Sequence, residues 1–153
     1  MIKALLMDFD GVMTDNKVYV DQNGVESVCC NRSDGLGIRF LKDRKIALAI
    51  ISTEANMVVT ARAKKLGIPI FQSVEDKSLV VKNFCIENKI GLNETAFVGN
   101  DINDLSAFEI VQKKICPKDS VEQVKSICDH VLSTNGGDGV IREISDKFDI
   151  IFL

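Results

Sequence analysis

Two aspartates near the start of the chain have a spacing that could support metal-dependent chemistry. Residues 2–7 are almost wholly apolar, which is typical of a short strand buried on both faces, and Asp8 and Asp10 follow directly. Both carboxylates can point into one small space where such a strand ends. Two buried anions repel each other, so we expect a cation to hold them, and carboxylate oxygens suit Mg²⁺. Aspartate is also common in turns after strands, so this pair alone does not establish a site.

Polar side chains that suit a phosphate group or a metal also follow three later strand-like segments. They are Ser52 and Thr53 after residues 46–51, Lys77 after residues 69–71, and Asn100, Asp101 and Asp104 after residues 95–98. Taken singly, each has an ordinary explanation as a helix cap or a solvated residue of a first helical turn. The carboxyl ends of parallel strands, however, meet at one edge of a sheet. We therefore expect all of these residues to form one site with the two aspartates.

The elements that would position these residues alternate between strand-like and helical patterns. Short apolar segments predict strands at residues 2–7, 46–51, 69–71, 95–98, 114–116 and 129–132. Apolar residues at helical spacing lie between them: Leu36, Phe40 and Leu41; Val58, Val59, Ala61 and Leu66; Leu79, Val80, Phe84 and Ile86; Leu105, Phe108 and Val111; Val121, Val124 and Ile127. This alternation predicts an α/β fold, a Rossmann-like parallel sheet with helices on both faces. No linker or repeat interrupts it, so we expect a single domain over residues 1–153.

A predicted β-hairpin at residues 17–30 interrupts this alternation. Strand-like residues 17–20 and 25–28 flank a turn at residues 21–24 that contains an Asn-Gly pair. The hairpin carries the apolar residues Val18, Tyr19, Val20, Val25 and Val28. A lone hairpin is unstable in water, and the unpaired edges of its strands tend to associate with other chains. We expect it to pack against another copy of the chain or to fold back onto its own domain.

Composition limits the classes of partner. The chain has 153 residues, of which 46% are hydrophobic and 27% charged, and its net charge is -3. No segment concentrates Lys and Arg, which argues against nucleic acid as a partner but allows a small anionic substrate. No apolar run is long enough to cross a membrane, and no signal-peptide pattern is present, so we expect no membrane partner. The five cysteines lack metal-binding spacing, which indicates free thiols in a reducing cytoplasm.

Taken together, the motifs resemble those of the haloacid dehalogenase superfamily of phosphatases. The shared pattern is an Asp-x-Asp strand end, a Ser or Thr strand end, a Lys, and an acidic loop after a glycine. The resemblance implies Asp8 as the nucleophile, Asp10 as the general acid and base, Ser52 as the phosphate-binding hydroxyl and Lys77 as the cation. It also implies Mg²⁺ as the cofactor and hydrolysis of a phosphate monoester through an aspartyl-phosphate on Asp8.

The implied magnesium site departs from the family's commonest motif. It would comprise Asp8, Asp10 and the loop that contains Asn100, Asp101 and Asp104. The residue directly after the glycine in that loop is usually an aspartate, and here it is Asn100. A neutral amide oxygen attracts Mg²⁺ less than a carboxylate, so Asp101 or Asp104 would have to compensate.

Within the superfamily, the chain resembles a branch without a cap domain that acts on 2-keto-3-deoxy sugar acid phosphates. Residues 10–15, 33–38 and 136–143 carry this resemblance. The segments between the motifs leave room only for the hairpin and single helices, which is why we expect no cap domain. Relatives of this build are tetramers in which the hairpins pack together and a neighbouring subunit covers the pocket. The resemblance also implies a tail around residues 136–143 that brings Arg142 toward an active site. The plainer alternative is a loop before a helix, followed by a surface Arg.

The resemblance favours a nine-carbon over an eight-carbon sugar acid phosphate. Octulosonate enzymes tend to have Thr-Gly-Arg after the second strand, whereas this chain has Ser52, Thr53 and Glu54, which resembles the nine-carbon phosphatases. Arg62 and Lys65 also match that branch, and their cations could meet the substrate carboxylate. Lys65 lies eleven positions after Glu54, about three helical turns, so the two would share a face.

Three other functions remain open at this stage. An octulosonate 8-phosphate phosphatase is the nearest alternative enzyme. A non-catalytic assembly domain associated with a sialic acid cytidylyltransferase is the alternative from another class, and Asn100 is its best support. The retained Asp8, Asp10, Ser52 and Lys77 favour catalysis instead. A phosphorylated receiver domain is a weaker possibility, because such domains also use an acidic pocket with Thr and Lys.

Overall fold

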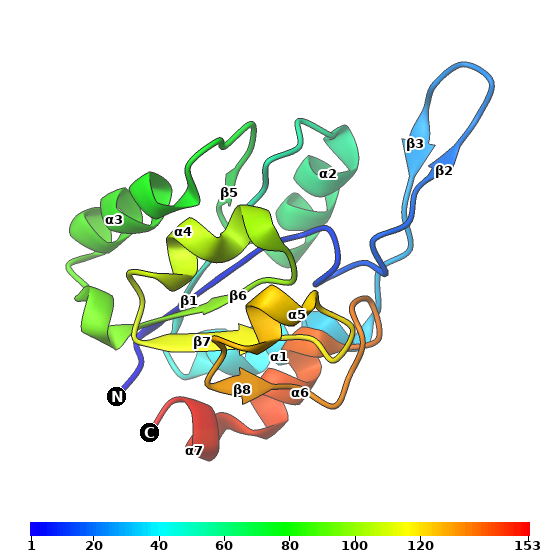
Figure 1. Ribbon diagram of the computed structural model, residues 1–153. Coiled ribbons are helices and arrows are strands. Elements are labelled where there is room, and N and C mark those ends of the chain that lie inside the picture. Colours follow the sequence, from blue (N-terminus) through cyan, green and yellow to red (C-terminus); the bar gives the residue numbers. More distant parts are fainter.

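A six-stranded parallel sheet forms the centre of the computed structural model, which describes residues 1–153 (Figure 1). Its strands follow the order β5-β4-β1-β6-β7-β8. Their bounds are β1 Ala4–Met7, β4 Ala47–Ile51, β5 Ile70–Phe71, β6 Thr95–Val98, β7 Lys113–Cys116 and β8 His130–Val131. Each predicted strand is present, and β1 lies between β4 and β6 in the middle of the sheet. The strands are short and apolar because both faces of the sheet are covered.

Helices cover both faces of the sheet. They are α1 Ser33–Asp43, α2 Met57–Leu66, α3 Lys77–Asn88, α4 Leu105–Phe108, α5 Glu122–Lys125, α6 Val140–Asp146 and α7 Phe148–Ile151, with 3₁₀ turns η1 Leu92–Glu94 and η2 Ile102–Asp104. Residues of α1, α2, α6 and α7 share one core of 23 buried residues, and those of α3, α4 and α5 share a second of 14. The predicted Rossmann-like fold is therefore confirmed. No helix combines the length and the apolar character needed to span a membrane.

No cap domain interrupts this fold. Between β1 and β4 the chain forms only the hairpin and α1, and between β4 and β5 it forms only α2. The prediction of a sheet without a cap is thus confirmed. One consequence is that the carboxyl edge of the sheet is not roofed by a second domain of this chain.

Several predicted helical stripes have the wrong phase. Leu36 of α1, Ala61 of α2 and Ile86 of α3 are exposed, although the sequence pattern assigned them to buried faces. On α1 the buried face contains Gly37 and Ile38, because α6 packs there from the other end of the chain. The apolar spacing also did not predict α7, whereas a helix after residues 136–139 was part of the plainer alternative for that segment. The element that packs against a helix can be far away in sequence. Local spacing alone therefore did not identify which face of the helix is buried.

The hairpin is present and projects away from the sheet (Figure 1). Its strands, β2 Tyr19–Val20 and β3 Glu26–Ser27, pair antiparallel, and the turn between them closes through Asp21, whose carbonyl accepts from the N–H of Gly24. Gly24 has a φ of 77°, which glycine adopts readily. Val28 is the exception among the predicted apolar residues, because it packs against the core of its own subunit. The other four remain exposed, with Tyr19 at 69%.

Candidate active site

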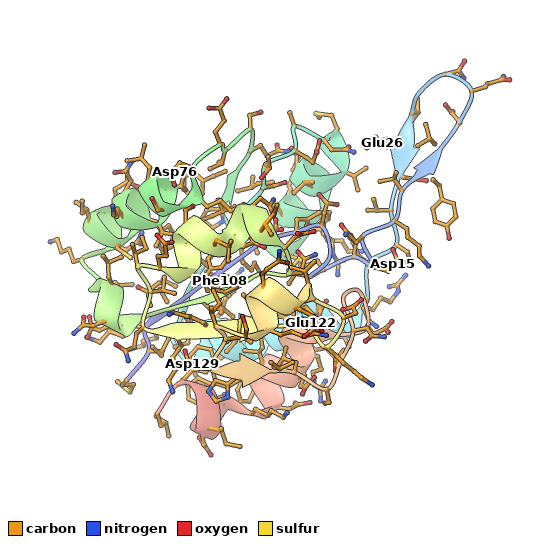
Figure 2. All side chains as sticks on the ribbon, in the orientation of Figure 1. Asp15, Glu26, Asp76, Phe108, Glu122 and Asp129 are labelled. Carbon is orange, nitrogen blue, oxygen red and sulfur yellow. The ribbon has the colours of Figure 1, made fainter.

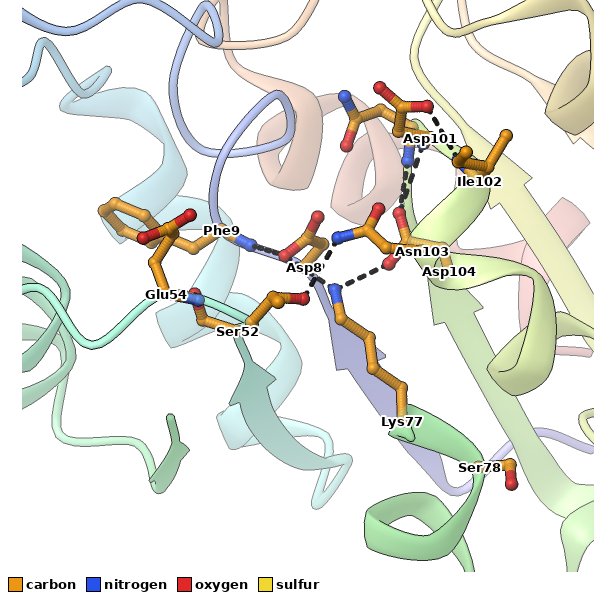
Figure 3. Close-up of polar contacts among 12 residues, drawn as sticks. Asp8, Phe9, Ser52, Glu54, Lys77, Ser78, Asp101, Ile102, Asn103 and Asp104 are labelled. Atoms are coloured by element: carbon orange, nitrogen blue, oxygen red, sulfur yellow. Dashed lines mark hydrogen bonds and ion pairs between the residues drawn. The ribbon is translucent and has the colours of Figure 1, made fainter. Parts of the chain in front are cut away.

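The carboxyl ends of three adjacent strands deliver the predicted residues to one place. Met7, the last residue of β1, pairs with Ile50 of β4 on one side and with Val98 of β6 on the other. The chain segments that follow these strands surround a cavity of about 180 Å³ (Figure 3). Polar residues alone line it: Asp8, Asp10, Asn16, Ser52, Thr53, Glu54, Asn100, Asp101 and Asn103. Parallel pairing thus gathers side chains from distant parts of the sequence, as the alternation of elements predicted.

A buried lysine holds the first aspartate in place. Lys77 begins α3 after its N-cap Asp76, and its side chain is completely buried. Its Nζ lies 2.9 Å from Oδ1 of Asp8 and 2.7 Å from Oδ1 of Asp104 (Figure 3). Burial alone would lower the pKa of Lys77, but the two carboxylates outweigh it and raise that pKa above its ordinary value. Lys77 is therefore a fixed positive charge beside Asp8.

Asp8 presents one free carboxylate oxygen to the cavity. Its Oδ1 accepts from the N–H of Phe9 at 2.7 Å and from Lys77, so Oδ2 is left without a protein donor. Burial, and then the charge of Asp104, raise the pKa of Asp8 to about 7, although Lys77 opposes the rise. An additional cation would favour the ionised form, which a carboxylate nucleophile requires.

Asp104 does not line the cavity, and the structure corrects its predicted role as a metal ligand. Its Oδ1 accepts from Lys77, while its Oδ2 accepts from the N–H groups of Asn100 and Asp101 at 2.8 and 3.3 Å. The side chain is fully buried. Gly99 permits this close approach, since a Cβ there would lie 2.4 Å from Oδ2 of Asp104. Asp104 instead positions Lys77 and the loop that carries Asn100.

The side chain of Asn100 has a buried oxygen that suits a metal ion. The residue is only 7% exposed, and its Oδ1 is buried without any hydrogen-bond donor. Gly11, with a φ of 84°, packs so closely that a Cβ there would meet the Asn100 side chain. No group of three or more His, Cys, Asp or Glu residues is arranged to hold a metal. Asp8 lines the same cavity, and its carboxylate together with the unpartnered Oδ1 of Asn100 suits a cation.

Two hydroxyl groups from the end of β4 face the same cavity. Oγ of Ser52 accepts from the N–H of Glu54 at 3.2 Å, so its own O–H remains free to donate. Oγ1 of Thr53 accepts from Nδ2 of Asn103 at 3.1 Å, which ties this loop to the segment after β6. The Ser52 hydroxyl is thus ready to bind an anionic oxygen.

Asp10 and Glu54 lie together at the rim of the cavity. Partial burial raises the pKa of Asp10 above its ordinary value, and the nearby charges of Glu54 and Glu26 raise it further, while Lys77 lowers it. A carboxyl group with a raised pKa can carry a proton nearer to neutral pH. Glu54 precedes α2 instead of lying on it. The prediction that it shares a helical face with Lys65 is therefore wrong.

Comparison with known proteins identifies the family. The family model described as haloacid dehalogenase-like hydrolase matches residues 39–144. The chain belongs to the haloacid dehalogenase-like hydrolases. The predictions of the superfamily and of an enzyme that hydrolyses phosphoric monoesters are thus confirmed.

Individual relatives share almost the full length of this hydrolase. The 3-deoxy-D-manno-octulosonate 8-phosphate phosphatase of Haemophilus influenzae is 35% identical over 146 residues, which cover 95% of this chain and 81% of the relative. A cobalt-bound form of that phosphatase superposes with a TM-score of 0.91, covering 95% of this chain and 85% of the other at 35% identity. The Moraxella catarrhalis enzyme of the same name, solved with magnesium, phosphate and a KDO molecule, gives 0.90 at 32% identity, with coverage of 97% and 90%.

Three predicted substrate-binding residues lie outside the catalytic cavity of this hydrolase. Arg62 and Lys65 line a separate basic cavity of about 340 Å³ between α1 and α2, where Nη2 of Arg62 donates to the carbonyl of Asn31. Nε of Arg142 donates to Asp146 on the surface of α6. Arg142 therefore does not approach the cavity of its own subunit, because residues 136–139 form the loop before α6.

Residues 136–139 pack against residues 8–16 after β1, here called the catalytic loop. The N–H of Gly137 donates to the carbonyl of Val12 at 3.1 Å, and Gly136 packs so closely that a Cβ there would clash with the Gly11 carbonyl. Within one subunit these residues match the plainer alternative, a loop before a helix followed by a surface Arg, while a reach toward the active site of a neighbouring subunit stays a prediction.

Two cavity residues of the hydrolase were missed by the sequence analysis. Asn16 lines the cavity from the catalytic loop with a φ of 66°, which is unusual for a residue other than glycine. Asn103 lines it from η2. An asparagine in a loop is too common to stand out in one sequence, so only the folded arrangement shows that these two face Asp8.

Proposed function

We propose that this chain is a Mg²⁺-dependent phosphatase that hydrolyses a sugar acid phosphate monoester through an aspartyl-phosphate on Asp8. The observation that carries the proposal is the arrangement around that residue. The free Oδ2 of Asp8 faces a wholly polar cavity, beside the buried cation of Lys77 and the free hydroxyl of Ser52. These groups can accept a phosphoryl group and neutralise its oxygens.

In the first step, Oδ2 of Asp8 attacks phosphorus and the bond to the sugar oxygen breaks. Lys77 and the Ser52 hydroxyl stabilise the negative charge on the transferring phosphoryl oxygens. Asp10 gives its proton to the departing alkoxide, a role to which its raised pKa is suited. The products of this step are the free sugar acid and an acyl phosphate on Asp8.

In the second step, Asp10, now ionised, takes a proton from a water molecule that attacks the acyl phosphate. The bond between phosphorus and Oδ2 of Asp8 breaks, which releases inorganic phosphate and restores the carboxylate. Splitting the hydrolysis in this way replaces one difficult displacement with two easier ones.

Asp8 and Asn100 would hold the magnesium ion, and Asp10 and Asp101 line the same cavity. When bound, the ion would neutralise charge on the phosphoryl group and favour the ionised form of Asp8. The magnesium reported for the Moraxella catarrhalis relative supports this choice of metal.

We propose a 2-keto-3-deoxy nine-carbon acid 9-phosphate as the substrate. The position of Glu54 supports this, because it lines the catalytic cavity next to Ser52 and Thr53. A carboxylate there can accept hydrogen bonds from substrate hydroxyls, whereas an Arg would favour an anionic group. Octulosonate 8-phosphate is the second candidate, favoured by the names of the relatives at 31–35% identity.

A homotetramer would complete this site. No Lys or Arg lines the catalytic cavity, yet the proposed substrate carries a carboxylate. The basic cavity with Arg62 and Lys65 could meet that carboxylate from a neighbouring subunit, and the exposed apolar hairpin provides a surface for assembly.

Phosphate release from paired substrates tests the proposal. The purified chain is incubated with nine-carbon and eight-carbon sugar acid phosphates, with Mg²⁺ or with a chelator. We expect turnover that needs Mg²⁺ and is faster for the nine-carbon ester. Preference for the eight-carbon ester would favour the second candidate, and no turnover of either ester would favour a non-catalytic assembly role.

Glu54→Ala separates recognition from chemistry in the same assay. A hydrogen bond to a charged group contributes about 1.5–3 kcal/mol, so the ratio of nine-carbon turnover to that of a small generic ester should fall about tenfold or more. Equal losses on both esters would mean that Glu54 supports the motif structurally.

A further inference from the structure

A second compartment opens beside the catalytic cavity, toward the base of the hairpin. It has a volume of about 250 Å³. The residues that line it are Asp10, Asn16, Val18, Glu26, Glu54 and Asn56. Three of these residues also line the catalytic cavity, namely Asp10, Asn16 and Glu54. The two spaces are therefore adjacent and share these side chains as a common wall. A group bonded to a phosphoryl on Asp8 could therefore extend from the catalytic cavity into this compartment.

The chemistry of the compartment matches hydroxyl groups. Its carboxylates accept hydrogen bonds, and the Asn16 amide can both donate and accept. A hydroxyl also does both, so a polyol could satisfy this mixed lining. No Lys or Arg lines the compartment. A carboxylate or second phosphate placed there would meet three acidic side chains and be repelled.

Glu26 is held in a defined position across the compartment from Asp10. It belongs to β3 at the base of the hairpin (Figure 2). Its Oε2 accepts from Nδ2 of Asn56 at 2.6 Å. Asn56 is itself fixed as the N-cap of α2, because its Oδ1 accepts from the N–H of Val58 at 3.0 Å. One oxygen of Glu26 thus anchors the side chain, and Oε1 has no protein donor.

We propose that this compartment binds the hydroxyl-bearing chain next to the phosphate and that Glu26 is a specificity-determining residue. The inference rests on the proposed function. In an octulosonate 8-phosphate or its nine-carbon counterpart, the phosphate and the carboxylate occupy opposite ends of the carbon chain. The carbons next to the phosphate carry hydroxyls, and these are the groups that reach Glu26. The carboxylate then points away from this acidic compartment.

Three six-carbon phosphate esters test the inference on the full-length chain. Sorbitol 6-phosphate carries hydroxyls along its chain, n-hexyl phosphate has none, and 6-aminohexyl phosphate ends in a cation. We expect the wild type to prefer the sorbitol ester over the hexyl ester in kcat/KM. Glu26→Ala should lower the ratio of these two values about tenfold or more, the worth of one charge-assisted hydrogen bond. Ser27→Ala, the next residue of β3, lines neither cavity and should keep the wild-type ratio.

Glu26→Gln distinguishes recognition from anchoring. It can still accept from Asn56 and so keeps the hairpin base in place, but it removes the charge. We expect a ratio between those of the wild type and Glu26→Ala. A wild-type ratio for Glu26→Gln beside a reduced one for Glu26→Ala would mean that Glu26 only anchors the hairpin, which overturns the proposal.

Three other outcomes would also overturn it. One is a wild type that turns over both neutral esters equally. A second is a Glu26→Ala variant that retains the wild-type ratio, and a third is a loss confined to the aminohexyl ester, which would make the compartment a cation site. Absence of turnover of the sorbitol ester, in a preparation that releases phosphate from a nine-carbon or eight-carbon sugar acid phosphate, would also overturn the inference. Absence of turnover of those sugar acid phosphates would overturn the proposed function, so the two failures are distinguishable.

Discussion

At the scale of single residues, Asp8 is costly for the fold. It is buried, and burial together with the charge of Asp104 raises its pKa to about 7. A buried carboxylate whose charge is only partly compensated adds little to the stability of a fold. Groups with strongly shifted pKa values are common at functional sites, because catalysis needs such values. The structure around Asp8 is thus better explained by reactivity than by stability.

Asp8→Asn should abolish turnover without harming the fold. An amide cannot form the acyl phosphate, so phosphate release should fall about 10³-fold or more. Lys77 keeps its contact with Asp104, and a buried charge is removed, so the melting temperature should be unchanged or higher. Thermal unfolding and phosphate release on the same preparation check both parts. Substantial residual turnover in a pure sample would exclude Asp8 as the nucleophile.

Asn100 sets the affinity for Mg²⁺ in our interpretation. Asn100→Ala removes the unpartnered Oδ1, so the Mg²⁺ concentration for half-maximal activity should rise about tenfold or more. Asn100→Asp adds a charge beside Asp8 and should lower that concentration. Calorimetric titration of Mg²⁺ into each variant measures binding independently of turnover. If Asn100→Ala bound Mg²⁺ as tightly as the wild type, Asn100 would not be a ligand.

At the scale of elements, α6 depends on a residue from a distant helix. Oδ1 of Asp34 in α1 accepts from the N–H groups of Ile141 and Arg142 at 2.9 and 3.1 Å. A seven-residue helix is too short to be stable alone, so this contact and packing on α1 must hold it. Burial raises the pKa of Asp34 to about 6, although the two N–H groups oppose the rise.

Asp34→Asn should change how stability depends on pH. The folded pKa of Asp34 is raised above the unfolded value, so its favourable contribution is complete below about pH 4 and is lost as the pH rises through about 6. Between pH 4.5 and 7, the free energy of unfolding of the variant should therefore improve relative to the wild type by about 2 kcal/mol. Urea unfolding at both pH values measures this difference. No change in the relative stability would show that Asp34 is not protonated preferentially in the folded state.

At the scale of the whole molecule, the hairpin leaves most of its apolar side chains uncovered by its own subunit. Val18, Tyr19, Val20 and Val25 are all exposed on it. Among the side chains of the hairpin, only that of Glu26 is hydrogen-bonded to the rest of the fold, through Asn56. Exposed apolar residues on a projecting hairpin indicate an interaction surface. The absence of a cap leaves the nearby cavity open for a neighbouring subunit to cover.

Light scattering should therefore give a mass about four times the 16.9 kDa of one chain. The double substitution Tyr19→Asp and Val20→Asp should lower that mass, because charges on the packed hairpins would repel. Ile86→Asp on α3 is a matched control, since Ile86 is equally exposed but lies away from the hairpin, and it should keep the wild-type mass. A monomeric wild type with full activity would contradict assembly through the hairpin.

The sequence by itself determined the strands, the hairpin and the residues at the strand ends. Local patterns sufficed because a buried parallel strand needs a continuous apolar segment, and the chain must leave the sheet with polar residues. The family motif then placed Asp8, Asp10, Ser52 and Lys77 in one site before any contact was known, and the structure brings them together.

Tertiary structure alone decided which side chains face the cavity and which only support it. Asp104 turned out to hold Lys77, and Lys65 and Arg142 lie elsewhere, because contacts with segments far away in sequence set the positions of these residues. Asn16 and Glu26 entered the site because the catalytic loop and the hairpin base fold beside the end of β1. Such contacts depend on three-dimensional packing between distant elements, and the spacing of residues along a single sequence does not reveal them.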